Sequence, residues 1–189
     1  AAVLLFLLPG CGDDDPTTPP PPPPPTFVYP ESPDSLLRAY RDAYEARDAV
    51  RIDSLLAPGF VFTFETTERD SFGVEPTWDR AAEMTSTERF FAGEAGIWPD
   101  GTPHAPVNDF AFNTVLDPRE GSEWSLDAST GTWWREYAVS LVVTYVDFDV
   151  DFVSGTQRFE VADMSEVGGP AGEPAAGYAI VGWQDLGME

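Results

Sequence analysis

Seven consecutive prolines, Pro19–Pro25, decide which part of this chain can fold. Proline has no amide donor and its ring fixes φ, and residues 12–30 as a whole show no apolar periodicity. We therefore expect a polyproline II rod that rises about 3.1 Å per residue and acts as a stiff spacer. The alternative is a ligand for a proline-recognising module. The folded core must then come from residues 31–189.

The segment before the prolines resembles a bacterial lipobox. The apolar run Ala1–Leu8 leads into Pro9, Gly10 and Cys11. In a lipobox a signal peptidase cuts just before a cysteine whose thiol carries a diacylglyceryl group, and the small Gly10 suits the cleavage position. The alternative is a cysteine that follows an apolar stretch by chance. We predict that residues 1–10 are the remnant of a signal peptide and that Cys11, the chain's only cysteine, is lipidated.

A lipidated Cys11 would hold the protein at a membrane without a spanning helix. The apolar run is far shorter than the roughly 20 residues that a spanning helix needs. Stable attachment takes more than one acyl chain, which a triacylated cysteine with palmitate supplies. We expect a lipoprotein of the bacterial cell envelope, in the outer membrane if the source has two membranes, with residues 11–30 as lipidated cysteine and linker.

The charge of the chain excludes one class of partner. It has 33 acidic residues against 10 basic ones, all arginine, for a formal net charge of -23. The negative electrostatic potential around a chain with this charge repels phosphate backbones and anionic lipid headgroups. We therefore expect no nucleic-acid partner, and a domain that stands off the bilayer.

Helical spacing dominates the first part of the domain. Ser32 offers an N-cap before a helix whose apolar residues recur from Leu36 to Tyr44, and Asp48 caps a shorter second helix. Apolar residues among charges between Trp78 and Glu94 suggest a third helix, with Thr77 as its cap.

Strand patterns fill the rest. Alternation places Phe60, Phe62 and Phe64 on one face of a first strand, as in a half-buried sheet. Further strands are predicted over residues 107–116, 132–146, 150–161 and 178–186. In the last of these, the two-residue period places Ala179, Val181 and Trp183 on one face, toward the first helix. Helices followed by a meander of strands predict one α+β domain.

Four segments together resemble the nuclear transport factor two-like superfamily, which includes SnoaL-like and ketosteroid-isomerase-like proteins. They are Ser32-Pro33-Asp34, the helix with Tyr40, Tyr44, Arg47 and Asp48, the run Leu55–Phe62, and the final run Tyr178–Leu186 with Trp183 and Asp185. The resemblance covers nearly all of residues 32–187. It implies an α+β fold in which N-terminal helices pack in the concavity of a strongly curved antiparallel sheet, a cone-shaped, cystatin-like roll.

In such a cone the mouth can take a small apolar ligand. The resemblance makes Tyr40, Tyr44, Phe62, Trp78 and Trp183 candidates for its lining, with the Phe60/Phe64 pair as an alternative to Phe62. Aromatic residues on buried faces are also ordinary core residues, so both roles stay open. Relatives often pair through the open face of the sheet, which makes a homodimer a further expectation.

Enzymes of this superfamily use an Asp/His pair, or an aspartate base facing a tyrosine. The one histidine, His104, sits in a loop interrupted by proline and glycine, a poor platform for a base. Asp185 is the better candidate acid, although a capping carboxylate at a strand end is the simpler interpretation. The sequence shows no glycine-rich phosphate cradle and no serine elbow, so we expect no cofactor.

Three alternating aspartates, Asp147, Asp149 and Asp151, are the candidates for a metal site. On a straight strand neighbouring carboxylates of one face lie about 6.6 Å apart, too far for all three to ligate one ion. In a tight turn they could converge on calcium, but the segment lacks the glycine and final glutamate of an EF-hand. We favour a solvated edge, which also discourages strand-to-strand aggregation.

Two functions remain from the sequence. The preferred one is a lipid-anchored, non-catalytic domain that binds a small molecule or a protein. The other is a small isomerase, dehydratase or hydrolase that uses a carboxylate inside the cone. A buried carboxylate with a raised pKa, facing a cavity beside a tyrosine, would distinguish the enzyme.

Overall fold

The computed structural model describes residues 28–66, 75–97, 103–119, 121–147, 149–167 and 176–187. Cys11, the signal-peptide segment and the linker up to residue 27 lie outside the described residues. Within the described part, no helix is both long and apolar enough to cross a membrane.

The first two helices begin at the caps that the sequence predicts. Helix α1 spans Pro33–Glu45 and helix α2 spans Ala49–Leu55. Ser32 accepts a hydrogen bond from the Ser35 amide at 3.2 Å, and Asp48 accepts one from the Arg51 amide at 2.9 Å. Each side chain satisfies an amide that has no partner inside its helix, which fixes the helix start.

The third predicted helix is shorter than expected, and its predicted cap is wrong. Helix α4 spans Arg80–Phe91, and its N-cap is Asp79, which accepts a hydrogen bond from the Ala82 amide at 2.9 Å. Thr77 and Trp78 belong instead to strand β2 (Thr77–Asp79), which pairs with the first strand. Asp79, next to the helix, makes the capping hydrogen bond, whereas Thr77 and Trp78 before it pair with β1 in the sheet.

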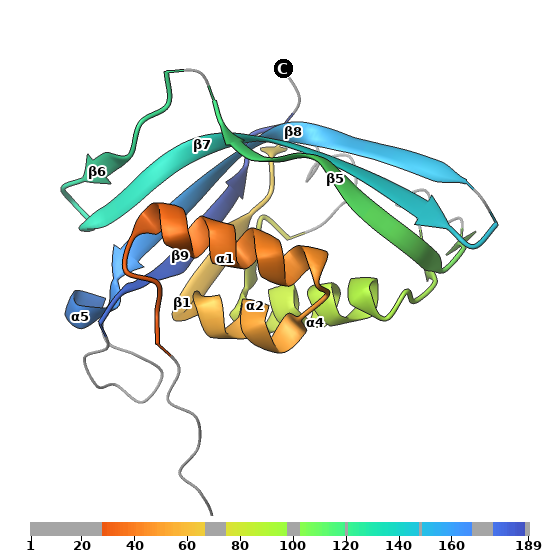
Figure 1. Ribbon diagram of the computed structural model, residues 1–189, viewed down its shortest axis with the longest axis horizontal. Coiled ribbons are helices and arrows are strands. Elements are labelled where there is room, and N and C mark those ends of the chain that lie inside the picture. The colour runs from red at the N-terminus through yellow and green to blue at the C-terminus, as the bar shows by residue number, and fades with distance from the viewer. Residues whose placement is uncertain are drawn as a thin grey trace, which may run out of the picture.

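One curved sheet forms the body of the domain, and α1 lies in its concavity (Figure 1). The strand order is β2-β1-β9-β8-β7-β5, with β6 beside β7. Figure 1 shows the long strands arching over α1, with α2 and α4 below it. The bounds are β1 Leu56–Thr63, β5 Val107–Pro118, β6 Ser125–Asp127, β7 Thr132–Tyr145, β8 Val150–Asp163 and β9 Tyr178–Asp185; the short β3 (Gly96–Ile97) and β4 (Pro103–His104) pair separately, and α5 spans Met164–Val167.

The predicted α+β fold with helices inside a curved sheet is confirmed, with one difference in strand direction. Strands β5, β7, β8 and β9 form the expected antiparallel meander. The first and last strands, β1 and β9, pair in parallel. The sheet is therefore mixed: β1 and β9, which come from opposite ends of the domain, are parallel neighbours, and its other strand pairs are antiparallel.

The predicted inward face is confirmed for Trp183, whose ring lies 6.0 Å from that of Tyr40 on α1, but it is wrong for Ala179 and Val181, because β9 carries a bulge. Glu160 pairs with Gly182 and Val161 pairs with Ile180, so Val181 is an extra residue in the ladder. Ile180 and Trp183 both pack in the main core, whereas Ala179 and Val181 pack in a second cluster. An extra residue shifts the two-residue alternation by one, which turns Trp183 to the face of Ile180.

The packed domain begins two residues earlier than predicted, at Tyr29. This side chain is 4% exposed and packs against Ala57, Met164 and Ala179. The Pro30 carbonyl accepts a hydrogen bond from the Tyr178 amide at 2.8 Å. Gly177 has φ +106 there, and a Cβ on it would lie 2.6 Å from the Tyr29 carbonyl oxygen. The end of the proline-rich segment is therefore part of the core.

We predict that Tyr29→Ala lowers the free energy of unfolding by about 3 kcal/mol, because it removes a buried aromatic side chain. The exposed neighbour provides the control, since Val28→Ala should change stability little. Urea denaturation followed by tryptophan fluorescence measures both. Equal stability of the two variants would place Tyr29 outside the core.

Candidate functional site

Aromatic rings from four elements fill the concavity of the sheet. Trp183 of β9 lies with its ring centroid 6.0 Å from Tyr40 of α1, 5.0 Å from Phe62 of β1 and 5.2 Å from Phe159 of β8. Tyr40, Phe62 and Phe159 are buried. Three of the predicted lining residues are thus in contact with one another, and they occupy the interior of the cone.

The other two predicted lining residues lie at the ends of this cluster. Tyr44 contacts Phe91 and Phe110, with ring centroids 5.0 and 5.7 Å away. Trp78 contacts Phe64 at 4.7 Å. Edge-to-face contacts at these distances are the favourable arrangement for aromatic pairs. The rings therefore act as the core that joins the helices to the sheet.

A buried carboxylate lies within this aromatic interior. Glu83 of α4 is 7% exposed, and its Oε1 accepts a hydrogen bond from the Thr87 hydroxyl at 3.3 Å. Burial raises the pKa of Glu83 to about 7, and the Thr87 bond opposes that rise. Glu83 therefore changes its protonation state near neutral pH.

Two tyrosines are close enough to Glu83 to sense its charge. Burial raises the pKa of Tyr40 well above its usual value, and the negative charge of Glu83 raises it further. The same two causes raise the pKa of Tyr44. Among the described residues, the Tyr40 hydroxyl and the Trp183 Nε1 are buried without a hydrogen-bond partner. The interior can therefore hold a proton on Glu83 and offers two donors that lack acceptors.

Sequence analysis missed Glu83, although a weak signal was present. Glu83, Met84 and Thr87 are the buried residues of α4. A glutamate with an apolar neighbour and a threonine four residues later fits an inward helix face, but α4 is charged on most sides and has no clear apolar stripe. Only the packing of α4 against β1 shows that this face is buried.

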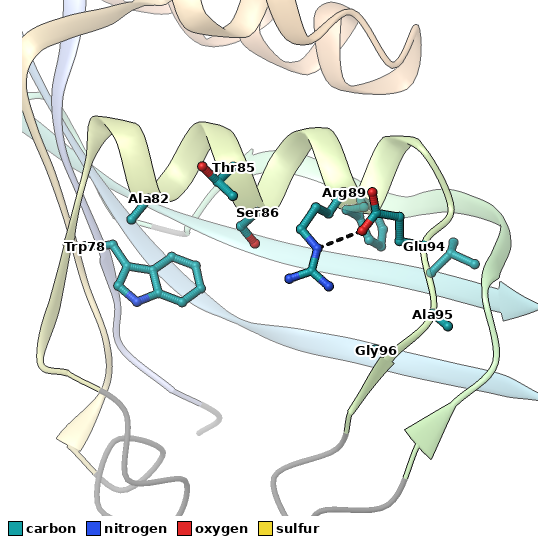
Figure 2. A pocket seen from close by; sticks show the side chains of 10 residues that line it. Trp78, Ala82, Thr85, Ser86, Arg89, Glu94, Ala95 and Gly96 are labelled. Atoms are coloured by element: carbon teal, nitrogen blue, oxygen red, sulfur yellow. Dashed lines mark hydrogen bonds and ion pairs between the residues drawn. The ribbon is translucent and has the colours of Figure 1, made fainter.

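A cleft lies on the other side of α4, and Glu83 is not among the residues that line it. It has a volume of about 760 Å³. Figure 2 shows Ala82 and Ser86 along the helix, Trp78 near one end, and Arg89 and Glu94 near the other. Arg89 Nε and Glu94 Oε2 are 2.8 Å apart, and both side chains are exposed.

The candidate acid Asp185 lies at the end of β9. Its Oδ1 accepts a hydrogen bond from the Gly187 amide at 2.9 Å. This is the geometry of a carboxylate that caps the turn after a strand. His104 lies in β4, paired with Gly96, and no side-chain geometry is described for it.

The three candidate metal ligands lie around the turn between β7 and β8. The Asp149 amide donates to Asp147 Oδ1 at 3.4 Å, and Asp151 accepts a hydrogen bond from the Tyr145 hydroxyl at 3.0 Å. Asp151 is already in strand β8. Within the described residues, no group of three or more His, Cys, Asp or Glu side chains is arranged to hold a metal ion.

Solved structures share the arrangement of helices and strands. ActVI-ORFA from Streptomyces coelicolor matches 81% of this chain and 92% of its own, with 12% identity and a TM-score of 0.50. A nuclear transport factor 2-like protein from Salmonella enterica serovar Typhimurium matches 82% of this chain and 87% of its own (8% identity, TM-score 0.49). A nuclear transport factor 2-like protein of unknown function from Burkholderia pseudomallei matches 82% of this chain and 88% of its own (12% identity, TM-score 0.44). The domain has the nuclear transport factor 2-like fold, with α1 in the concavity of a curved sheet, an arrangement that it shares with ActVI-ORFA.

At these identities the likeness shows the fold alone. No protein-family model matches the sequence, and no curated protein matches it. The nuclear transport factor 2-like fold of this chain sets the position of α1 relative to the sheet. The ligands or reactions that the cone can support depend on the side chains of this chain.

We predict that Glu83 makes the domain less stable as pH rises. The folded protein binds the Glu83 proton up to about pH 7, whereas the unfolded chain releases it near 4.5. Stability therefore falls between these values, by about 3 kcal/mol in total. Glu83→Gln should remove that loss, so the variant gains stability relative to the wild type from pH 5 to pH 8.

The control is Glu88→Gln, which neutralises an exposed glutamate on the same helix and should keep the wild-type pH dependence. Urea denaturation midpoints at pH 5, 6, 7 and 8 measure all three proteins. If Glu83→Gln follows the wild-type curve, the Glu83 carboxylate is solvated.

Proposed function

We propose that this protein is a lipid-anchored lipoprotein of the bacterial cell envelope whose domain is a non-catalytic interaction module. The proposal of an anchor rests on the sequence around Cys11. The proposal that the domain works without catalysis rests on one observation, the filling of the cone by its own rings. A substrate that entered the ring cluster near Glu83 would have to displace Tyr40, Phe62 or Trp183, since Tyr40 and Phe62 both contact Trp183.

One observation favours the alternative, an isomerase, dehydratase or hydrolase. Glu83 has a pKa near neutrality and lies close to two tyrosines, which is the combination that general acid-base catalysis uses. However, a general acid must come within hydrogen-bonding distance of its substrate. The carboxylate is 7% exposed and lines none of the described clefts.

The outer face of the sheet supports an interaction role. Tyr137, Val143 and Tyr145 of β7 are buried, so the alternate positions face outward, together with their partners on β8. Seven successive outward positions carry no charge: Ala138, Ser140, Val142, Thr144, Val150, Phe152 and Ser154. We call these seven residues the neutral face. Phe152 at its centre is 74% exposed.

A second copy of this chain is the partner that we propose for the neutral face. Two copies that each carry a formal charge of -23 repel each other over most of their surfaces. A face without charge avoids like charges in direct opposition. At the next outward pair along the strands, the two charges offset each other, because Arg158 and Glu136 form an ion pair with 2.7 Å between Nη2 and Oε1.

The anchor is tested by Cys11→Ala. Cells that express the wild type and are fed a radioactive fatty acid should label the protein, whereas the variant should carry no label, because the thiol of Cys11 is the only acceptor in the motif. Gly12→Ala serves as the control and should keep the label. Equal labelling of wild type and Cys11→Ala would remove the lipoprotein proposal.

The interaction role is tested by the oligomeric state. We predict that the wild type sediments as a dimer at micromolar concentration and that Phe152→Asp sediments as a monomer, because a charge is buried at the centre of the contact. Val153→Asp is the matched control: it adds the same charge at the next position, which is also exposed but faces the other side of the sheet, and should stay dimeric. A monomeric wild type would contradict the proposed pairing.

A further inference from the structure

A second cleft opens between α1 and the sheet, away from Glu83. It has a volume of about 360 Å³, within the range of small-molecule sites. Four residues of α1, one of β5 and two of β7 line it: Asp34, Leu37, Arg38, Arg41, Pro118, Arg135 and Tyr137. We call it the arginine cleft.

The charge of the arginine cleft is opposite to that of the chain. Three of the ten arginines line it, and Asp34 is the only acidic residue that does. In a protein with 33 acidic residues, three arginines around one cleft form a local positive site. Such a site concentrates an anion that the rest of the surface repels.

The arginines differ in how firmly they are held. Arg135 is largely buried; its Nε donates to the Ser122 carbonyl at 2.8 Å, and its Nη1 lies 3.4 Å from Asp34 Oδ1. Arg41 pairs with Asp42 at 2.8 Å, outside the cleft lining. Arg38 forms no ion pair or hydrogen bond with the described residues and is exposed. The cleft thus contains the guanidinium group of Arg135, which two protein partners hold, and that of Arg38, which is available to a ligand.

A buried donor in the same cleft lacks a partner. Tyr137 is 3% exposed, and its hydroxyl proton has no acceptor among the described residues. Burial raises the pKa of Tyr137 to about 12; the charge of Arg135 and donation from its guanidinium oppose that rise and the charge of Asp34 adds to it, so the hydroxyl lies near the charged side chains of the cleft. Buried hydroxyl groups normally have a partner. An anion oxygen at this point would accept from Tyr137 and from guanidinium groups together.

We propose that the arginine cleft binds the carboxylate of a small organic acid with an apolar body. The guanidinium groups of Arg38 and Arg135 supply charge-assisted hydrogen bonds, and the Tyr137 hydroxyl adds a neutral one. Leu37 and Pro118 supply apolar contact for the rest of the molecule.

A monocarboxylate fits this site better than a phosphate ester. Asp34 lies in the cleft, and the net charge of the chain is strongly negative, so the second charge of a phosphate dianion meets additional repulsion. The site does not depend on the anchor or on the neutral face. Tyr137 points into the concavity, whereas its neighbour Ala138 belongs to the opposite, outward side of β7.

The test is calorimetric titration of the full chain in detergent with benzoate at low ionic strength. We expect saturable binding of benzoate, weaker binding of the neutral benzamide, and weaker binding of phenyl phosphate. Arg38→Gln and Tyr137→Phe should each weaken benzoate binding at least about five-fold, since the first removes a positive charge and the second removes a hydrogen-bond donor to the anion.

Arg89→Gln is the matched control, because it removes the same charge at the cleft on α4 and should leave benzoate binding unchanged. Three outcomes would overturn the proposal: no saturable binding, equal binding of benzoate and benzamide, or equal weakening by Arg38→Gln and Arg89→Gln. Tighter binding of phenyl phosphate would overturn the choice of a carboxylate. Lipid labelling and sedimentation are unaffected by any of these results.

Discussion

Contact between α1 and the curved sheet through Tyr40 and Trp183 is the interaction on which the rest of this structure depends. Trp183 is stacked on Phe159 with an interplanar angle of 19° and meets Tyr40 and Phe62 edge-on. These rings come from the first helix and from three strands that are far apart in the chain. Because a protein interior is packed as closely as an organic crystal, the rings set the distance between helix and sheet and occupy the space that a ligand would need beside Glu83.

That packing also explains the electrostatics of the interior. A carboxylate surrounded by rings loses its hydration, so Glu83 holds its proton to about pH 7, and the hydroxyl of Tyr40 and the indole nitrogen of Trp183 have no partner among the described residues. Polar groups of this kind in an enzyme would face a substrate. Here the rings enclose them, which is why we assign the interactions of the domain to its surfaces.

The two proposed binding surfaces, the arginine cleft and the neutral face, lie on opposite sides of strand β7. Along β7, inward residues such as Arg135 and Tyr137 meet α1 and line the arginine cleft, and the outward residues from Ala138 onward form the neutral face. The pleat of a strand separates them, so a ligand on one side and a second copy on the other do not compete. The proposed anchor and proline-rich spacer would keep both surfaces clear of the bilayer.

The sequence by itself determined the elements whose signals are local. The caps Ser32 and Asp48 and the alternation of the long strands depend on neighbouring residues, and the family resemblance carried by four segments between Ser32 and Leu186 predicted the curved α+β fold. Tertiary structure decided the rest, because it depends on residues far apart in the chain: the parallel pairing of β1 with β9, the bulge that separates Trp183 from the face of Ala179 and Val181, and the packing that buries Tyr29 and Glu83. A period of two residues cannot reveal an extra residue in a ladder, and a helix with charge on most sides does not show which face will be covered.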